Sequence, residues 1–338
     1  MNNIKKVLSH KFSPILSFSL SMMEILLVTA LLVFSLIIVK GGETEPATGK
    51  PTFDSPLPSP TPGIVLVKET PTPRPDPVLN LTFTHEPIYL SLGNGGSYTV
   101  GTVANVSNED ILRFEGTDFV MFFNGSDVGL SSVDLDALTL VDADTILMSF
   151  NDPITLSLGV VDDSDILQFD ATSLGDTTAG DFSWFFDGSD VDLTLDGEDV
   201  DGIDLLPDGQ LLLSTTGGVS VSGLSAEDED VLIFTPTAYG ENTSGSWAIY
   251  FDGSDVGLAD TTDENVDGLG VSTSGSIYLT TLGSFAVTGI SGEDEGVFVC
   301  IPANLGNDTA CTFSSALSFD GALWGLSIND VDAIETLP

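Results

Sequence analysis

An eight-residue string recurs along this 338-residue chain, and its clearest copy reads Phe251-Asp252-Gly253-Ser254-Asp255-Val256-Gly257-Leu258. Residues 186–193 and 123–130 repeat it with one difference each, and a degenerate copy occupies 319–326. The four copies begin 63, 65 and 68 residues apart. Repeats at a nearly constant interval indicate one structural unit that is used four times.

Each period contains four strand-like runs, here called A, B, C and D in chain order. Examples are 266–271 for A, 276–281 for B, 230–234 for C and 247–251 for D. These runs are rich in β-branched and aromatic residues and are separated by Gly, Ser, Asp and Asn, which favour turns. Because no helical period follows Pro77, the sequence predicts an all-β fold.

The repeats are out of phase with the chain ends. Ile88–Leu92 matches a B run that has no A run before it, whereas Asp330–Ile334 matches the A runs 134–138, 199–203 and 265–269. A ring that closes on itself requires this arrangement, and a β-solenoid or a row of immunoglobulin-like modules fits it less well. We therefore predict a four-bladed β-propeller over 80–338, closed by the C-terminal strand. Its blades span about 86–130 plus 329–338, 132–195, 198–260 and 264–328.

Two resemblances accompany this prediction. The A-turn-B pattern Leu205-Leu206-Pro207-Asp208-Gly209-Gln210-Leu211-Leu212-Leu213 resembles β-propeller proteins in general. The repeated string is similar to that of uncharacterised bacterial surface proteins. Both resemblances cover about residues 86–338, and they imply an architecture but no activity.

The first 79 residues differ in kind from the rest. Residues 15–39 are apolar except for Glu24 and are long enough to cross a membrane, so the Lys-containing tail 1–14 is expected inside and the later chain outside. The Pro-rich segment 40–79 is typical of an extended linker. The same start also fits a cleaved secretory signal, which would release the protein, and residues 20–28 resemble the start of a type IV pilin.

The charge is strongly asymmetric. The chain has 51 acidic and 8 basic residues, a net charge of -43, and past Pro77 its only Lys or Arg is Arg113. Nucleic acid is excluded as a partner because phosphate binding needs a basic surface. Nucleophilic triads and Schiff-base lysines likewise lack their residues in this region. We expect no enzymatic activity, although an extracellular hydrolase acting on polysaccharide through channel-side carboxylates is the alternative.

Each A run carries a matched aspartate, namely Asp136, Asp201, Asp267 and Asp332. If the A strands line the channel, these carboxylates face one another, and their oxygens suit calcium. Hemopexin-like domains, which also have four blades, are similar in placing ions in their channel. The alternative is that each aspartate only fixes the turn before its strand. No other cofactor is expected.

Two cysteines, Cys300 and Cys311, are the only ones in the chain. They flank the predicted C-to-D hairpin of the last blade, and an exported compartment would permit a disulfide between them. Taken together, the sequence predicts a single-pass cell-surface protein whose propeller binds an extracellular protein or glycan, with a pilin-like surface component as a lesser alternative.

Overall fold

The computed structural model describes residues 87–336 except 94 and 260. The predicted tail, membrane anchor and linker, residues 1–79, lie outside this range. Within it, no helix is both long and apolar enough to cross a membrane.

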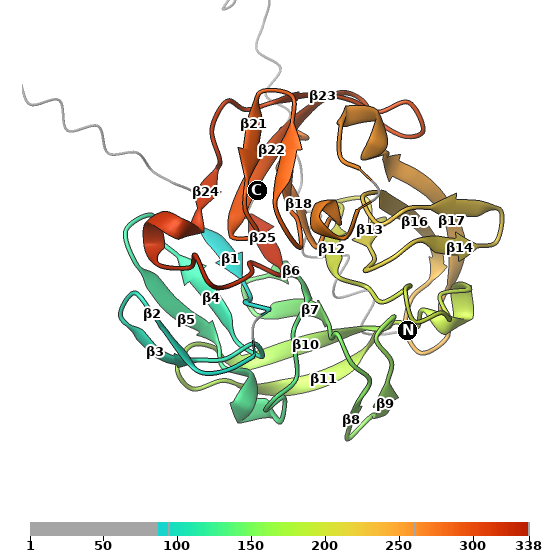
Figure 1. Ribbon diagram of the computed structural model, residues 1–338. Coiled ribbons are helices and arrows are strands. Elements are labelled where there is room, and N and C mark those ends of the chain that lie inside the picture. The colour runs from blue at the N-terminus through green and yellow to red at the C-terminus, as the bar shows by residue number, and fades with distance from the viewer. Residues whose placement is uncertain (1–86, 94, 260, 337–338) are drawn as a thin grey trace, which may run out of the picture. The chain divides into compact units, whose positions relative to one another are not determined.

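Four large antiparallel sheets form the body of the described chain, and each corresponds to one predicted blade (Figure 1). The predicted all-β, four-bladed propeller is confirmed. The first sheet has the order β25 (Ile334–Thr336), β1 (Ile88–Leu90), β4 (Ile111–Phe114), β5 (Phe119–Phe123). The second has β6 (Ala137–Asp142), β7 (Thr145–Ser149), β10 (Ile166–Ser173), β11 (Ala179–Phe186). The third has β12 (Gly202–Leu205), β13 (Leu211–Ser214), β16 (Val231–Ala238), β17 (Ser244–Phe251). The fourth has β18 (Gly268–Val271), β19 (Ile277–Thr280), β22 (Gly296–Asn304), β23 (Ala310–Phe313), with β24 (Phe319–Asp320) also pairing β22.

The first blade joins the two ends of the described chain. Strand β25 pairs antiparallel with β1, so that Ile88 lies opposite Thr336 and Leu90 opposite Ile334. The innermost strands contact one another in the cyclic order β25, β6, β12, β18 and back to β25. The sheets therefore form a closed ring around these four strands.

Short elements complete each blade. A two-stranded hairpin stands between the second and third strands of every sheet: β2 (Tyr98–Val100) with β3 (Val103–Val106), β8 (Ile154–Leu156) with β9 (Gly159–Val161), β14 (Val219–Val221) with β15 (Leu224–Ala226), and β20 (Phe285–Val287) with β21 (Ile290–Gly292). Single turns of 3-10 helix follow the last strand of each blade: η1 (Gly125–Val128), η2 (Ser189–Val191), η3 (Ser254–Val256) and η5 (Gly321–Trp324). A further turn, η4 (Thr262–Glu264), precedes β18.

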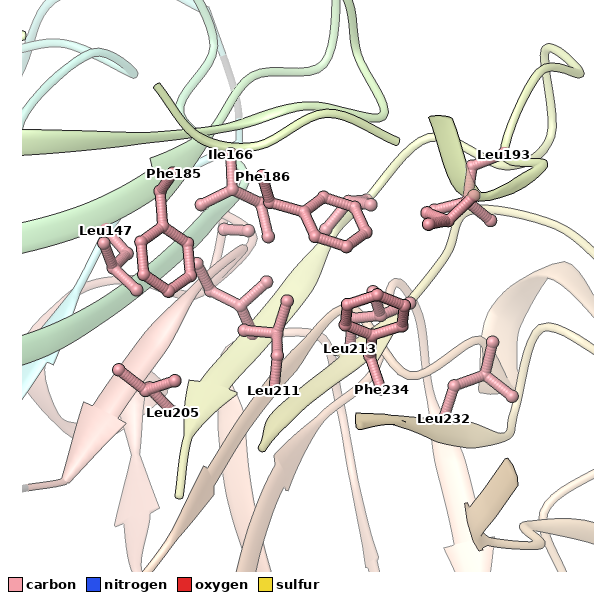
Figure 2. Packing of buried hydrophobic residues seen from close by; sticks show 14 of the residues in the cluster. Leu147, Ile166, Phe185, Phe186, Leu193, Leu205, Leu211, Leu213, Leu232 and Phe234 are labelled. Atoms are coloured by element: carbon pink, nitrogen blue, oxygen red, sulfur yellow. The ribbon is translucent and has the colours of Figure 1, made fainter. Parts of the chain in front are cut away.

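The hydrophobic core lies between successive blades. Figure 2 shows the interface of the second and third blades, where Phe186 approaches Phe234. Their ring centroids are 5.3 Å apart in an edge-to-face arrangement, and Phe123 and Phe169 repeat this contact at 5.2 Å. The first Phe of the repeated string is thus the side chain that packs one blade onto the next.

The repeated string also links blades through hydrogen bonds. The Thr178 amide donates to Asp127 Oδ2 at 2.9 Å, and the Asn124 amide donates to Thr178 Oγ1 at 2.9 Å. The same reciprocal pair joins Asp190 to Thr243 and Asp255 to Thr309. Each threonine lies in the turn of the outer hairpin of the following blade, immediately before its last strand. The repeated string therefore links one blade to the next.

The glycine of the string has a different role from the one its sequence suggests. An Asp-Gly pair predicts a tight turn with positive φ at glycine, but Gly188 and Gly253 have φ of -65° and -67°. A Cβ at Gly188 would lie 2.4 Å from the carbonyl oxygen of Ser164. Glycine is required here because the backbone of the same blade passes too close for a side chain.

The fourth copy lacks this link for a structural reason. Its partner would be the outer hairpin of the first blade, but β4 and β5 are joined by a short turn of four residues, 115–118, and the fourth copy has Leu323 in place of the bonding aspartate. Trp324 instead packs against Phe114 with ring centroids 4.7 Å apart. The degenerate string therefore faces a blade whose outer hairpin is shorter than those of the other blades.

Cys300 on β22 and Cys311 on β23 form a disulfide, with their Cα atoms 5.4 Å apart. The bond crosses the last blade's outer hairpin. Cys300 is fully buried.

Candidate metal centre in the channel

The four matched aspartates all lie at the start of the inner strands. Asp136, Asp201 and Asp267 immediately precede β6, β12 and β18, and Asp332 lies two residues before β25. Their exposed fractions are only 2%, 3%, 2% and 8%. One end of the ring of inner strands is therefore lined by buried carboxyl groups from four blades.

A second set of acids stands two positions earlier. Asp134, Asp199 and Asp330 occupy these positions, and Asn265 takes the place of the fourth. The sequence carried this signal as an Asp-apolar-Asp pattern in three A runs, but the prediction used only one aspartate from each. Residues two apart in an extended segment point to the same side, so both sets face the channel.

The apolar residue between the two acids fixes their direction. Leu135, Val200, Val266 and Val331 are fully buried. Each donates its amide to a carbonyl of the preceding blade, as Val331 does to Asp294 O at 3.2 Å. With the middle side chain held in the inter-blade core, the flanking carboxyl groups are directed away from it.

Several of these carboxylate oxygens have no hydrogen-bond partner. Both oxygens of Asp136, Oδ2 of Asp332 and Oδ1 of Asp330 are buried and unpartnered. A turn-fixing aspartate would accept backbone N–H groups, so this role does not describe Asp136. Buried polar atoms normally have a hydrogen-bond partner, so the missing partners of these oxygens need an explanation, such as a bound ion.

Burial and mutual repulsion shift the pKa values of this cluster upward. Burial first, and neighbouring carboxylates second, raise the pKa of Asp136, Asp267 and Asp332 well above the ordinary value. Burial likewise raises the pKa of Asp201 to about 8 and that of Asp199 to about 9. The cluster is therefore costly to ionise unless a cation is present.

No basic side chain of the described residues neutralises the cluster. Arg113 is the only Lys or Arg between 87 and 336, and it pairs with Glu115. By contrast, the ligand oxygens of Asp267, Asp330 and Asp332 all lie within 4.8 Å of one another. Such a set of hard oxygen donors suits calcium, which takes six to eight oxygens including carbonyls and water.

The opposite end of the inner strands borders a pocket of about 690 Å³. Its walls include residues of all four inner strands and the aromatic side chains Tyr89 and Phe122. These two rings pack edge to face with centroids 4.6 Å apart. A concave site with apolar walls and a few polar groups is typical of ligand binding.

The pocket contains two buried acids, Asp204 and Glu335. Thr139 Oγ1 lies 2.6 Å from Glu335 Oε2 and 3.3 Å from Asp204 Oδ1. The amide of Leu140 donates to Glu335, and that of Val271 donates to Asp204. These carboxylates therefore connect inner strands of different blades. Each stands three residues after the matched aspartate of its A run, but the other two runs have Thr139 and Gly270 at this position, and sequence reasoning did not single the two acids out.

Comparison with known proteins adds little. The sequence matches no protein-family model, and a search of curated proteins finds no match. Among solved structures, the chain is similar to the extracellular domain of a protein described as a one-component system from B. thetaiotaomicron, at 13% identity and a TM-score of 0.25. That match covers 68% of this chain and 33% of the other. At this TM-score it informs neither fold nor function, and the strand pairing alone defines the propeller.

Proposed function

We propose that the propeller is the extracellular binding module of a membrane-anchored protein, and that a calcium ion bound at the acidic end of the channel stabilises it. The observation that carries the calcium part is the group of buried carboxylates, because Asp267, Asp330 and Asp332 have unpartnered oxygens within reach of one another and Arg113, the only Lys or Arg of the described residues, pairs with Glu115. A divalent cation would supply the missing charge and the missing partners together.

Thermal unfolding tests the calcium part. The full-length protein in mild detergent is compared in chelator, in CaCl2 and in NaCl of equal ionic strength. We expect calcium to raise the Tm, because binding to the folded protein adds RT ln(1 + [L]/Kd) to its free energy of unfolding. This is about 2.7 kcal/mol at a free calcium concentration of a hundred times Kd. Equal shifts in CaCl2 and NaCl would exclude a specific site and leave only screening.

The pocket supports the binding role. Its aromatic walls and three acids, Asp142, Asp204 and Glu335, against the single Arg113, favour a neutral or amino-bearing sugar over an anionic one. The proposed partner is therefore a glycan. An array of neutral and acidic oligosaccharides tests this with the full-length protein. We expect neutral or amino sugars to be retained and sialylated or sulfated ones not.

Variants locate the bound glycan. Phe122→Ala removes an aromatic wall of the pocket and should abolish retention, whereas Trp324→Ala, a partly exposed aromatic outside the pocket, should leave it unchanged. Equal loss in both variants would contradict binding in the pocket.

Hydrolysis is the second candidate, because Asp204 and Glu335 lie close enough to share the Thr139 hydroxyl. Both are already used to hold backbone amides, which favours binding. New reducing ends appearing from a retained oligosaccharide, and disappearing in Glu335→Gln, would support the enzyme instead.

The location is tested separately. Residues 15–39 are proposed to anchor the protein, with the propeller outside. In intact cells that make the full-length protein, external protease should cleave the 40–79 linker and release the propeller. A soluble protein in the medium with no protease treatment would favour the cleaved-signal alternative.

A further inference from the structure

We propose that the calcium ion lies off the channel axis, between Asp267, Asp330 and Asp332, where it locks the C-terminal closing segment to the fourth blade. The inference rests on the proposed calcium binding, and it changes the expected ligands from one aspartate per blade to three acids at one seam. It also gives the ion a role in ring closure.

The three acids come from two different parts of the chain. Asp267 precedes β18, the inner strand of the fourth blade, whereas Asp330 and Asp332 belong to the segment that leads into β25. Their ligand oxygens lie within 4.8 Å of one another. An ion held by all three therefore bridges the fourth blade to the strand that completes the first.

All three acids have oxygens that point to a missing ligand. Both oxygens of Asp267, Oδ1 of Asp330 and Oδ2 of Asp332 are unpartnered, and the three residues are only 2%, 9% and 8% exposed. The surrounding backbone is close: a Cβ at Gly93 would lie 3.1 Å from the Asp332 carboxyl, and one at Gly268 would lie 3.1 Å from Asp332 O. The Asp332 carboxyl group therefore packs directly against the backbone at Gly93.

The neighbouring seam is built differently. Asn265 takes the place of the aspartate two residues before Asp267, and its amide donates to Asp201 Oδ2 at 3.5 Å and to Thr216 O at 3.2 Å. A side-chain amide thus donates at this seam, where the closing seam has the carboxylate of Asp330 at the matching position. This difference favours an ion at the closing seam.

The closing segment needs such a lock. Strand β25 has three residues and pairs with β1 over three positions. Before it, Val331 donates to Asp294 O, and Ala333 exchanges hydrogen bonds with Ser91. The carboxylates of Asp330 and Asp332 repel Asp267 across the same seam, so in the absence of an ion the chain closes against like charge.

Calcium titration by calorimetry of the full-length protein locates the ion. The variants are Asp330→Asn and Asp332→Asn, with Asp136→Asn, which lies before β6 and outside the three-acid group, as the matched control. We expect one ion per chain, and a loss of affinity of more than about tenfold in the two seam variants, since each removes a charged ligand. The control should retain its affinity.

The outcomes separate this inference from the proposed function. Equal loss in Asp136→Asn would place the ion on the axis and overturn the seam site while preserving calcium binding. No heat and no calcium-dependent Tm shift in the unmodified protein would overturn both. Misfolding is recognised separately: neutralising one repelling acid should raise the Tm in chelator, and a variant with a lowered Tm is replaced by Asp267→Asn.

Hydrogen exchange tests the lock itself. If opening of the closing segment requires release of the ion, exchange in 330–336 should slow by a factor of 1 + [L]/Kd, about a hundredfold at a hundred times Kd. Exchange in β12 serves as the internal control and should change less. Uniform slowing across all four inner strands would show general stabilisation and contradict a lock at the seam.

Discussion

At the scale of single residues, the disulfide replaces a packing pair found in two other blades. Gly180 and Gly245 lie under the rings of Phe169 and Phe234, and a Cβ on either glycine would come within 2.5 Å of its ring. In the fourth blade both positions are cysteine, at 300 and 311. A phenylalanine that packs over a glycine is thus replaced by two cysteines of intermediate size, which are joined by a disulfide.

This exchange predicts a non-additive pair of substitutions. Cys300→Phe alone should destabilise the protein by about 1–3 kcal/mol because the ring meets the Cβ of Cys311. Cys300→Phe combined with Cys311→Gly restores the pair of the other blades and should recover part of this loss. Chemical denaturation with reductant present, against Cys300→Ser with Cys311→Ser, measures both. Additive losses would show that the two positions do not share one space.

At the scale of elements, the blades are held together by a device that spans the sequence. Asp127 and Thr178 are 51 residues apart, yet each contacts the other's backbone segment, and two more copies follow the same geometry. The link needs a long outer hairpin in the next blade, because the threonine stands at its tip. The first blade has the shortest such hairpin, and the string that faces it has lost its second aspartate.

Removing one link should have a measurable and local cost. Asp190→Ala deprives the buried Thr243 of its acceptor, and we expect a loss of about 1–2 kcal/mol. Leu323→Ala is the matched control, since Leu323 holds the corresponding position in the fourth copy and is 76% exposed. Urea unfolding compares the two. A similar loss in both would mean that the Asp–Thr contact does not stabilise the interface.

Much of the element-level architecture follows from the sequence. The phase shift between Ile88–Leu92 and Asp330–Ile334 predicts closure, because strand order is a property of the repeat itself. The roles of Gly188 and of the Asp–Thr links are different: they depend on how closely two segments approach in space. No local pattern contains that distance. An Asp-Gly pair suggests a turn that needs positive φ, whereas here the glycine is needed because another backbone segment passes close to it.

At the scale of the whole molecule, acidic side chains gather at a buried place, where their ionisation destabilises the fold. The chain has a net charge of -43, and the acids of the A runs come together at one end of the channel. Their position was predictable in part from the matched aspartates. The unpartnered oxygens and the close grouping of Asp267, Asp330 and Asp332 were not, since they arise where the C-terminal segment meets the fourth blade.

This charge distribution predicts how stability depends on pH without divalent cations. Every carboxyl group with a resolved pKa shift in the described residues is shifted upward: Asp110, Asp134, Asp136, Asp163, Asp165, Asp199, Asp201, Glu229, Asp230, Asp267, Glu295, Asp330 and Asp332. Burial is the largest cause in each case. The folded protein therefore binds more protons than the unfolded chain above the ordinary carboxyl pKa.

Stability in chelator should consequently fall as the pH rises. Protonated groups with raised folded pKa values stabilise the fold at acid pH, and this contribution is lost between about pH 4 and the folded values, about 6 for Asp110 and Asp165 and about 8 for Asp330. Saturating calcium binds the ionised carboxylates, so it should reduce the slope above pH 6. Tm values from pH 5 to 9, with and without calcium, provide the measurement. A Tm in chelator that rises toward pH 9 would contradict an uncompensated acidic channel, and parallel curves would show that the ion does not bind these groups.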